Sequence, residues 1–426
     1  MPWLLNAFYI SVLCFASPWL LWRSWRTGRY RKHVGAKLFG IRKPIGLDRP
    51  VWFHGVSVGE IHLLVGLIRA FRMRYPGVPV VVSSSTDTGL AEANASFPND
   101  TVIAFPFDFS WACRRTLRSV EPRLVVLAES ELWPNFLAAA NRRSIPVVVV
   151  NGRLSEKSQR RSRRFAFLLR PLIWNRVAHI AMQSDSDAAA LVSLGVLPDR
   201  VSVTGSVKYD GASGVADPSK VESLRTAFPI PVGAPIWVAG STHAPEEAIV
   251  LRVFLRLKAR VPMLQLILVP RHPDRFGDVA ALLEAMAIPF VRRSRPSADR
   301  ADVLLLDTIG ELGAAWSLAT VGFTGGSFDG KRQGQSMIEP AGFGVPNCFG
   351  PHVSNFRDAA KRLVAAGGAV QVPGETELEA TLAEWLSDDA LRSRIGAIAK
   401  TLVQQQQGAT ERTLAILSAW IEPVSR

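Results

Sequence analysis

Residues 51–75 have the sequence "VWFHGVSVGEIHLLVGLIRAFRMRY". The run begins with bulky apolar residues typical of a buried strand, continues through a turn that contains Gly55 and Gly59, and ends in apolar residues at helical spacing. A strand that enters a helix through a short turn is the repeating unit of a parallel sheet covered by helices on both faces. The run therefore predicts an α/β fold.

The same order of strand, turn and helix recurs along most of the chain. A stretch rich in Gly, Ser, Pro and Asp, "YDGASGVADPSK" at 209–220, interrupts it, and the pattern restarts with "PIWVAGS". We therefore predict two doubly wound, Rossmann-like α/β domains whose strands end at a cleft between them. The predicted divisions are 1–44 for a membrane anchor and basic juxtamembrane segment, 45–208 for the N-terminal domain, 209–220 for the linker, 221–404 for the C-terminal domain and 405–426 for a final helix that could pack back across the domains.

The bulk composition is that of a folded protein with anionic partners. A chain of 426 residues is long for one core, and 48% hydrophobic with 20% charged residues excludes general disorder. Three widely separated cysteines without metal-ligand spacing indicate a reducing compartment. A formal net charge of +14 favours phosphate-bearing partners. Because the sequence contains no zinc finger, RNP motif or basic zipper, nucleic acid is not an expected partner.

The N-terminus combines an apolar run with a basic one. Residues 3–22 carry no charge and have about the length that spans a bilayer, and the basic run 23–33 follows directly. A cleaved signal peptide would carry its positive charge before the apolar run. We therefore predict an uncleaved anchor that holds the protein at the cytoplasmic face of the inner membrane, in contact with anionic lipid. Because Asn6 and Pro18 weaken the span, a helix half-inserted in the interface is the alternative.

The turn at 55–60 matches two motifs with different consequences. Gly55 to Gly59 fit G-x-S-x-G, which presents a serine nucleophile in many hydrolases, whereas Ser57 to Glu60 fit the S-x-x-E capping box. A hydrolase nucleophile would need an oxyanion loop from an earlier strand, and only the predicted anchor precedes this one. Because no Asp followed by His completes a triad at later strand ends, we exclude the hydrolase. Glu60 is then either a capping group or a residue that does chemistry.

Polar residues follow most of the predicted strands, at the end of a parallel sheet where ligands bind. In the first half they are hydroxyl, amide, carboxylate and guanidinium groups, which suit a hydroxyl-rich ligand. The candidate acceptor- or sugar-binding residues are Ser57, Gly59, Thr86, Glu129, Glu131, Asn151 and Arg153.

The second half of the chain suits a nucleotide. Arg271 can fork onto phosphate oxygens, and Glu339 can accept the hydroxyls of a ribose, although each could equally be a salt bridge or a helix-dipole partner. The candidate nucleotide-binding residues are Ser241, Pro270, Arg271, His272, Ile309, Gly310, Glu311, Ser336 and Glu339. Because the sequence carries no metal-binding signature, we expect Arg271, Lys208 and helix N-termini to stabilise a departing phosphate without a metal or other cofactor.

Taken in order, the strand-end motifs resemble those of the Kdo transferase family, enzymes that add 3-deoxy-D-manno-octulosonic acid (Kdo) to lipid A precursor. The resemblance runs through nearly the whole chain after the predicted anchor. The matching motifs are "HGVSVGE", "SSSTDTG", "FPFD", "AESELWPN", "NGRLS", "VTGSVKYD", "AGSTH", "VPRHP", "DTIGEL", "GGS" and "IEP".

This resemblance implies a metal-independent, inverting glycosyltransferase of the GT-B type that moves Kdo from CMP-Kdo to lipid IVA in lipopolysaccharide inner-core synthesis. It implies that Glu60 is the general base. Arg271 and Lys208 are the other predicted catalytic residues, and Lys208 and Glu129 match residues of the family's polar cleft. The residues that match the family's CMP contacts are Arg271, His272, Gly310, Glu311 and Glu339.

The sequence departs from the family's motifs around the donor. Gln335 and Ser336 replace the usual His and Asn, Ser206 replaces an Asn, and Pro245 replaces a Gly. Two alternatives therefore stay open beside Kdo transfer. One is a GT-B glycosyltransferase that uses another nucleotide sugar, and the other is a non-catalytic relative that binds a sugar nucleotide or a lipid.

Overall fold

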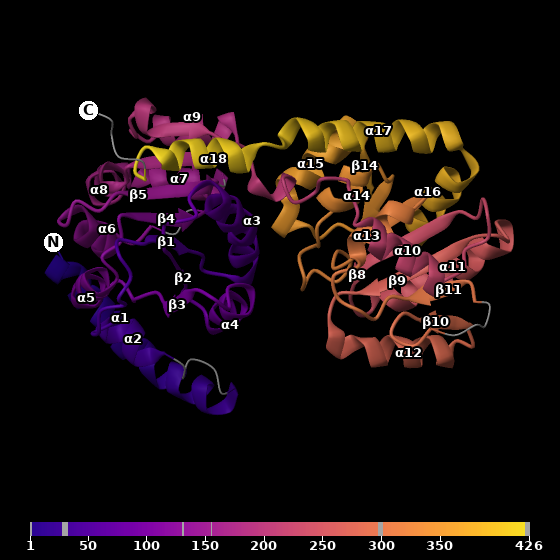
Figure 1. The fold of residues 1–426 in the computed structure, drawn as a ribbon, viewed down its shortest axis with the longest axis horizontal. Coiled ribbons are helices and arrows are strands. Elements are labelled where there is room, and N and C mark those ends of the chain that lie inside the picture. The colour runs from indigo at the N-terminus through magenta and orange to yellow at the C-terminus, as the bar shows by residue number, and fades with distance from the viewer. Residues whose placement is uncertain (1, 28–32, 130–131, 155, 297–300, 422–426) are drawn as a thin grey trace. The chain divides into compact units, whose positions relative to one another are not determined.

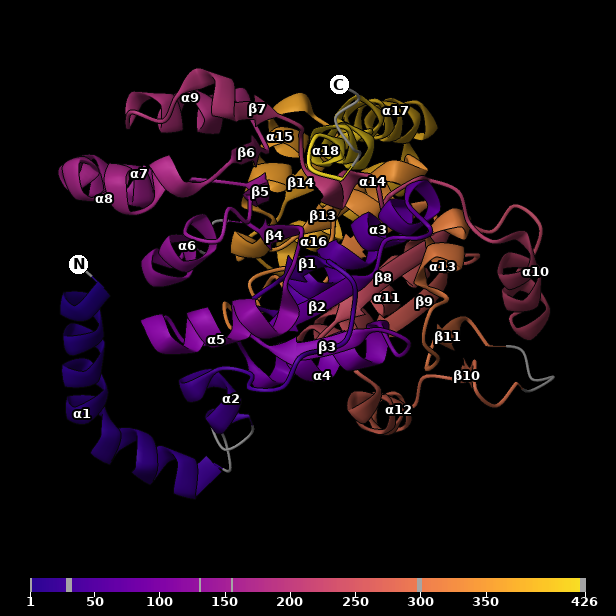
Figure 2. The same ribbon diagram turned by 60° about the vertical axis from the view of Figure 1, so that its left-hand side comes forward.

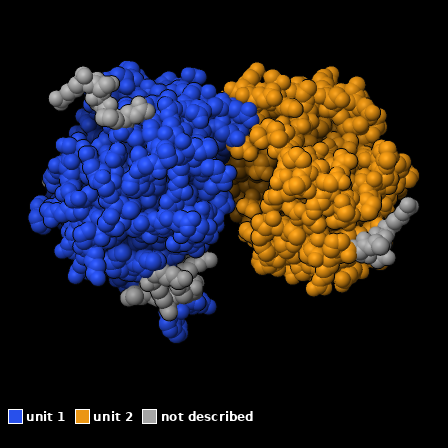
Figure 3. Space-filling view, in the orientation of Figure 1, with its two compact units in different colours: residues 1–210, 407–426 blue, residues 211–406 orange. Residues whose placement is uncertain are grey.

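The computed structural model describes residues 2–27, 33–129, 132–154, 156–296 and 301–421. The chain forms two compact units, which Figure 3 shows in different colours. Unit 1 contains residues 1–210 and 407–426, and unit 2 contains residues 211–406.

The core of unit 1 is a seven-stranded parallel sheet with the order β3-β2-β1-β4-β5-β6-β7 (Figure 2). Its centre is β1, in which Val51 pairs with Val80 of β2 and with Leu124 of β4. The chain therefore reverses its direction of winding at β1, as in other doubly wound sheets. The strands are β1 (Val51–His54), β2 (Val80–Ser84), β3 (Thr101–Ala104), β4 (Leu124–Ala128), β5 (Val147–Gly152), β6 (His179–Met182) and β7 (Val201–Val203).

Helices cover both faces of this sheet. Consecutive residues of β1 point to opposite faces, so Trp52 belongs to one buried cluster and Phe53 to the other. The helices of unit 1 are α1 (Pro2–Thr27), α2 (Val34–Phe39), α3 (Val58–Arg74), α4 (Asp87–Ser96), α5 (Ser110–Val120), α6 (Pro134–Asn141), α7 (Glu156–Arg164), α8 (Ala166–Leu172), α9 (Asp185–Ser193) and α18 (Ala409–Ser418). Short 3-10 helices are η1 (Trp174–Arg176), η2 (Pro198–Arg200) and η3 (Val207–Tyr209).

The last helix, α18, belongs to unit 1 although the preceding helix belongs to unit 2. Leu414 and Leu417 join the buried cluster that contains Phe53. The carboxylate of Asp210 accepts the backbone N–H groups that begin the helix, including that of Gly408 at 2.7 Å. An acidic side chain at this end satisfies N–H groups that have no partner within the helix.

Unit 2 is built in the same way around a parallel sheet with the order β10-β11-β9-β8-β12-β13-β14. Its direction of winding reverses at β8, where Trp237 faces one buried cluster and Val238 the other. The strands are β8 (Ile236–Thr242), β9 (Gln265–Pro270), β10 (Phe290–Arg292), β11 (Val303–Leu305), β12 (Val321–Thr324), β13 (Asn347–Phe349) and β14 (Ala369–Gln371). The helices are α10 (Pro218–Ala227), α11 (Glu246–Arg260), α12 (Phe276–Ala285), α13 (Leu312–Leu318), α14 (Ile338–Phe343), α15 (Arg357–Ala366), α16 (Glu375–Ser387) and α17 (Asp389–Gln406), with 3-10 helices η4 (Pro273–Arg275) and η5 (Ser354–Phe356).

The prediction of two doubly wound α/β domains is confirmed. The predicted linker, 209–220, is shorter in the structure, because α10 already begins at Pro218. Asp217 is the N-cap of this helix and accepts the Ser219 N–H at 2.9 Å. The run of Pro and Asp that resembled a linker is therefore partly a helix start.

The prediction of a membrane-spanning N-terminal helix is not confirmed. Among the described residues, no helix is both long enough and apolar enough to cross a bilayer. The first half of α1 instead packs beside α5 (Figures 1 and 2). Asn6 is 3% exposed, its Nδ2 donates to Ser110 Oγ at 2.8 Å, and its Oδ1 accepts the Ser110 N–H at 3.1 Å. A polar residue that weakened the predicted span thus attaches the helix to unit 1.

Candidate active site

The turn between β1 and α3 holds Glu60 in a capping box. Ser57 is the N-cap of α3, and its hydroxyl accepts the Glu60 N–H at 3.4 Å and donates to Glu60 Oε1 at 3.0 Å. Glu60 Oε2 accepts the Val56 N–H at 2.9 Å. A Cβ at Gly55 would lie 3.1 Å from the Cβ of Glu60, so the turn favours glycine there. The Glu60 carboxylate is thereby fixed, half-buried, at the carboxyl end of β1.

Lys208 lies among three other charged side chains of unit 1. Burial lowers the pKa of the Lys208 ammonium, an effect that Glu129 and Glu60 oppose and that Arg153 reinforces. Arg153 Nε lies 3.5 Å from Glu129 Oε2. We call Glu60, Glu129, Arg153 and Lys208 the unit 1 charge cluster. It brings together four predicted residues that are distant in the sequence.

The order of strands explains how this cluster forms. β1, β4 and β5 are neighbours, so the residues that follow them meet at one edge of the sheet. Glu129, directly after β4, has a left-handed φ of 57°. Such a conformation costs free energy in a residue with a Cβ and is often found at functional sites.

Asn151, a predicted sugar-binding residue, instead supports the cluster from inside the protein. It is fully buried at 0% exposure, and its φ of 54° is again left-handed. Its Oδ1 accepts the Val207 N–H at 3.1 Å, which fixes the first residue of η3 beside Lys208. The structure thus shows Asn151 supporting η3, and direct contact between Asn151 and a sugar stays a prediction.

Three further predicted residues of unit 1, Thr86, Gly59 and Glu131, do not belong to the unit 1 charge cluster as defined above. Thr86 is the N-cap of α4, where its hydroxyl accepts the Gly89 N–H at 3.0 Å and donates to the Val56 carbonyl at 2.8 Å. Gly59 is exposed in the first turn of α3. Glu131 lies outside the described residues. Thr86 therefore ties the turn after β2 to the turn that carries Glu60.

In unit 2, the predicted nucleotide-binding residues lie at or after the ends of four neighbouring strands, β11, β9, β8 and β12. Arg271, directly after β9, donates its backbone N–H to the Thr242 carbonyl of β8 at 3.0 Å. Its Nε donates to Gln335 Oε1 at 3.2 Å. The amide of Gln335 reaches His243, with 3.4 Å between the two nitrogens. Arg271, His243, His272 and Gln335, with Arg332, form what we call the unit 2 basic cluster.

Two arginines and two histidines lie together in this cluster. The rings of His243 and His272 lie edge to face, 5.2 Å apart. Burial and then the neighbouring charge of Arg332 lower the pKa of His243 to about 4, and burial and then Arg271 lower that of His272. Because both imidazoles stay neutral near pH 7, the positive charge there comes from arginines, which bind phosphate groups well.

Glu339 and Ser336 lie beside this cluster at the start of α14. The Ser336 side chain bonds to the Glu339 carboxylate, and the charge of Arg271 also acts on it. Burial outweighs both effects and raises the pKa of Glu339. A carboxylate in this place can accept hydroxyl groups of a ligand.

The loop after β12 is fixed by Glu246, which sequence reasoning missed. This carboxylate is 1% exposed and accepts the N–H groups of Gly326 at 2.7 Å and Ser327 at 2.8 Å. It also accepts those of His243 at 3.0 Å and Phe328 at 3.1 Å. A concave set of backbone N–H groups is an anion-binding nest, and here the protein fills it with its own carboxylate. The nest ties the "GGS" loop to the turn after β8.

Two of the predicted residues after β11, Gly310 and Glu311, already bond to side chains of unit 2. Ile309 is exposed, and Gly310 has a left-handed φ of 84° and accepts Lys220 Nζ at 2.9 Å through its carbonyl. Glu311 forms an ion pair with Arg293 at 2.8 Å and also binds the Thr308 hydroxyl. Its carboxylate is therefore already matched by a cation. Ser241 has a left-handed φ of 57° within β8, and Pro270 is buried at the end of β9.

Comparison with known proteins decides the family. Residues 24–211 match the family described as 3-deoxy-D-manno-octulosonic-acid transferase (kdotransferase). The chain is 32% identical to the 3-deoxy-D-manno-octulosonic acid transferase of Haemophilus influenzae, over 97% of this chain and 98% of that protein. The protein belongs to the Kdo transferase family. The enzyme of the same description from Bordetella pertussis is 35% identical, over 95% of this chain and 96% of that protein.

The resemblance predicted from the strand-end motifs is thus confirmed, and the protein is a glycosyltransferase of this family. Solved structures agree on the fold. A putative UDP-N-acetylglucosamine 2-epimerase from Listeria monocytogenes matches with a TM-score of 0.58 at 14% identity, over 88% of this chain and 98% of that one. A likeness at this identity shows a shared two-domain α/β architecture.

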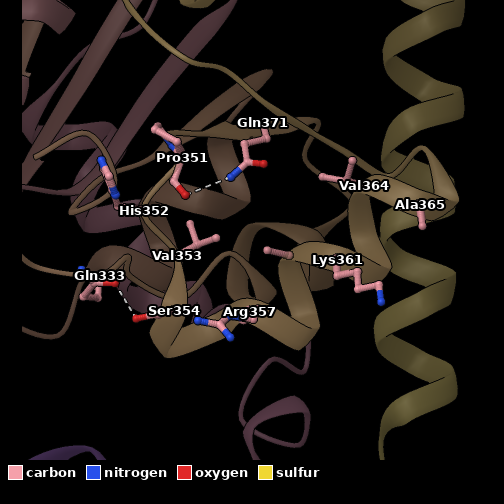
Figure 4. A pocket seen from close by; sticks show the side chains of 11 residues that line it. Gln333, Pro351, His352, Val353, Ser354, Arg357, Lys361, Val364, Ala365 and Gln371 are labelled. Atoms are coloured by element: carbon pink, nitrogen blue, oxygen red, sulfur yellow. Dashed lines mark hydrogen bonds between the residues drawn. The ribbon is translucent and has the colours of Figure 1, made fainter. Parts of the chain in front are cut away.

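A hollow of about 630 Å³ in this Kdo transferase family member lies in unit 2, between the loop after β13 and α15 (Figure 4). Gln333 lies at its edge and accepts the Ser354 hydroxyl at 2.5 Å. Its lining residues are Gln333, Pro351, His352, Val353, Ser354, Arg357, Ala360, Lys361, Val364, Ala365 and Gln371. It contains none of the predicted site residues.

The predicted absence of a metal remains a prediction. Within the part of the chain that the structure describes, no three His, Cys, Asp or Glu side chains are grouped so that they could hold a metal ion. Sequence reasoning also missed His243 and Arg332 as members of the unit 2 basic cluster, and it identified Gln335 only as a departure from the family's motif around the donor. The signal that could have found them is their position, since each lies in a loop that follows β8 or β12.

Proposed function

We propose that the protein transfers Kdo from CMP-Kdo to the lipid A precursor lipid IVA, with inversion at the anomeric carbon and without a metal, in the synthesis of the lipopolysaccharide inner core. The observation that carries this proposal is the match to Kdo transferases along nearly the full length of both chains. The two charged clusters supply groups for the acceptor and for the donor.

The unit 2 basic cluster is the proposed donor site. The guanidinium of Arg271 would bind the phosphate of CMP-Kdo and stabilise the charge that grows as CMP leaves. Ser336 and Glu339 would form hydrogen bonds with the ribose hydroxyls. The backbone at Gly310 and the polar groups of Ser241 and His272 would hold the rest of the nucleotide.

The unit 1 charge cluster is the proposed acceptor site. Glu60 would accept the proton of the lipid hydroxyl as its oxygen forms a bond to the anomeric carbon of Kdo. The bond from that carbon to the phosphate oxygen breaks, and CMP leaves with the electron pair. Lys208 belongs to the same cluster, where its charge and that of Glu60 interact.

Contact with the membrane is proposed through α1. Several large apolar side chains of this helix are exposed, among them Phe15 at 90% and Trp25 at 79%. Such a surface suits the boundary between lipid head groups and acyl chains. Arg26 at the end of α1 could bind anionic head groups. We therefore propose that the protein works at the cytoplasmic face of the inner membrane, where α1 lies on the lipid surface.

The mass of the lipid product tests the proposal. Purified full-length protein in detergent is incubated with lipid IVA and CMP-Kdo, and parallel reactions contain UDP-sugars instead. We expect the mass of lipid IVA to rise by whole Kdo residues only with CMP-Kdo. A product formed only with a UDP-sugar would show that this sugar nucleotide, and not CMP-Kdo, is the donor. CMP binding without any product would indicate a non-catalytic relative.

A further inference from the structure

We propose that Gln335 is a positioning residue for the donor, which holds Arg271 by its Nε and leaves the terminal guanidinium nitrogens for the phosphate. The inference rests on the proposed function of the unit 2 basic cluster as a donor site. It concerns a residue that stands where the resemblance to the family implies a histidine.

Both ends of the Gln335 amide are used. Its Oε1 accepts the Arg271 Nε–H at 3.2 Å, and its Nε2 lies 3.4 Å from His243 Nε2. Arg271 has only donors, so the amide oxygen must face it and the NH₂ group must face the histidine. His243 Nε2 is then the acceptor, and its proton lies on Nδ1. This assignment needs a neutral imidazole, in agreement with the lowered pKa of His243.

The loop that carries Gln335 is fixed before any ligand arrives. The Gln335 N–H donates to the Gly325 carbonyl at 3.2 Å, and the Gly334 N–H donates to the Gly326 carbonyl at 2.7 Å. Gly326 is itself held by Glu246. At Gly334, with a φ of 85°, a Cβ would lie 3.0 Å from the Cα of Val353. The amide is therefore attached to a rigid segment, as positioning requires.

The bond to Arg271 matters because a carboxylate competes for the same guanidinium. The charge of Arg271 acts on the Glu339 carboxyl group, so the two groups lie near each other. An arginine that pairs through its terminal nitrogens with a carboxylate offers fewer N–H groups to a phosphate. By holding Nε, the neutral amide of Gln335 keeps the guanidinium from turning onto Glu339 and adds no negative charge to the site.

Gln333 provides a matched control on the same loop. It accepts the Ser354 hydroxyl, and its Nε2 donates to the Gly330 carbonyl, at the edge of the hollow beside α15 (Figure 4). Neither bond involves Arg271 or His243. A Gln333→Met variant therefore removes a glutamine from the loop without touching the proposed contact.

The test compares Gln335→Met, Gln335→Glu and Gln333→Met with the wild type. Calorimetry measures the Kd for CMP, and steady-state kinetics measure KM for CMP-Kdo and kcat. For Gln335→Met we expect CMP binding to weaken about tenfold, as for loss of one hydrogen bond to a charged group, with a rise in KM and little change in kcat. Gln335→Glu should bind CMP more weakly still, because its carboxylate neutralises Arg271 and repels the phosphate.

A second readout separates positioning from a structural role. In Gln335→Glu the new carboxylate lies beside His243 and should raise the pKa of its imidazole, which proton NMR can follow. Wild-type affinity for CMP in Gln335→Met, or equal weakening in Gln333→Met, would overturn the inference and leave the proposed function standing. A wild-type protein that binds neither CMP nor CMP-Kdo would overturn both.

Discussion

Asn151 and Val207 are joined by a hydrogen bond inside unit 1, in which the Asn151 carboxamide oxygen accepts the Val207 N–H at 3.1 Å. The residue after Val207 is Lys208, so the bond sets where η3 presents its ammonium group to Glu60 and Glu129. A buried amide thus helps to set the geometry of the unit 1 charge cluster.

We expect Asn151→Ala to lower both stability and activity. Removing the amide leaves the Val207 N–H buried without an acceptor, at a cost of about 1–3 kcal/mol in the free energy of unfolding. Urea denaturation measures that cost, and the rate of Kdo transfer reports the displacement of Lys208. Asn94→Ala is the control, since the Asn94 side chain bonds within its own helix, to the Leu90 carbonyl. Equal activity in the two variants would show that Asn151 does not position Lys208.

The attachment of α1 to unit 1 should depend on Asn6. In Asn6→Ala, Ser110 and Asn135 lose their buried partner, so α1 should separate from unit 1 more often. Hydrogen exchange followed by mass spectrometry should show faster exchange in peptides from the first half of α1. Ser11→Ala is the control, because Ser11 is exposed and bonds to the Ala7 carbonyl of the same helix. Unchanged exchange in Asn6→Ala would contradict this account of α1.

The exposed apolar side chains of α1 should govern binding to lipid. A Phe15→Ser, Trp25→Ser double variant should bind less to vesicles of phosphatidylethanolamine and phosphatidylglycerol, as measured by flotation. The matched control is Val232→Ser in unit 2, where Val232 is fully exposed. If the double variant and the control floated equally with the wild type, α1 would not be the membrane contact.

Stability should depend on pH through Asp108. Burial raises the pKa of Asp108 from its ordinary 3.8 to about 6, although the Asn135 and Phe136 N–H groups oppose the shift. The folded protein then holds this proton more tightly than the unfolded chain does. The resulting stabilisation is full below about pH 4 and is lost as pH rises through about 6, with a total of about 3 kcal/mol for a shift of about two pKa units.

The comparison of wild type with Asp108→Asn isolates this effect. Between about pH 4 and pH 6, the unfolding free energy of the wild type should fall relative to that of the variant, because the carboxamide of the variant has no proton to lose in this range. Urea denaturation at several pH values measures the difference. Asp199→Asn, at an exposed position, is the control. A constant difference across this range would show that Asp108 titrates normally.

Much of the fold was predictable because its signals are local. Runs such as 51–54 and 236–242 are apolar and bounded by turn residues, and each leads into a helix. Polar residues placed after successive strands were also predictable as a site, since parallel strands end at one edge of the sheet. Glu60, Glu129 and Arg153 come together for this reason, whereas Lys208 follows β7 at the far edge of the sheet and is held beside them by the Asn151–Val207 bond.

The remaining features depend on contacts between distant parts of the chain. Glu246 has the pattern of an ordinary first-turn acidic residue, and its role comes from N–H groups about eighty positions later. The bond from Asn151 to Val207 joins residues more than fifty positions apart, so it could not be deduced from a polar strand end. The uncharged run at 3–22 suggested a span, whereas the partners that bury Asn6 lie at Ser110 and Asn135.

The central claim is that Glu60 takes the proton of the acceptor hydroxyl, and a single-turnover measurement with CMP-Kdo and lipid IVA tests it most directly. We expect Glu60→Gln to transfer Kdo at least about a hundredfold more slowly than the wild type, as for loss of a general base, while its Kd for CMP stays unchanged. Glu92→Gln, which changes a carboxylate on α4 paired with His62, should transfer at the normal rate. Transfer by Glu60→Gln at the wild-type rate would contradict the claim.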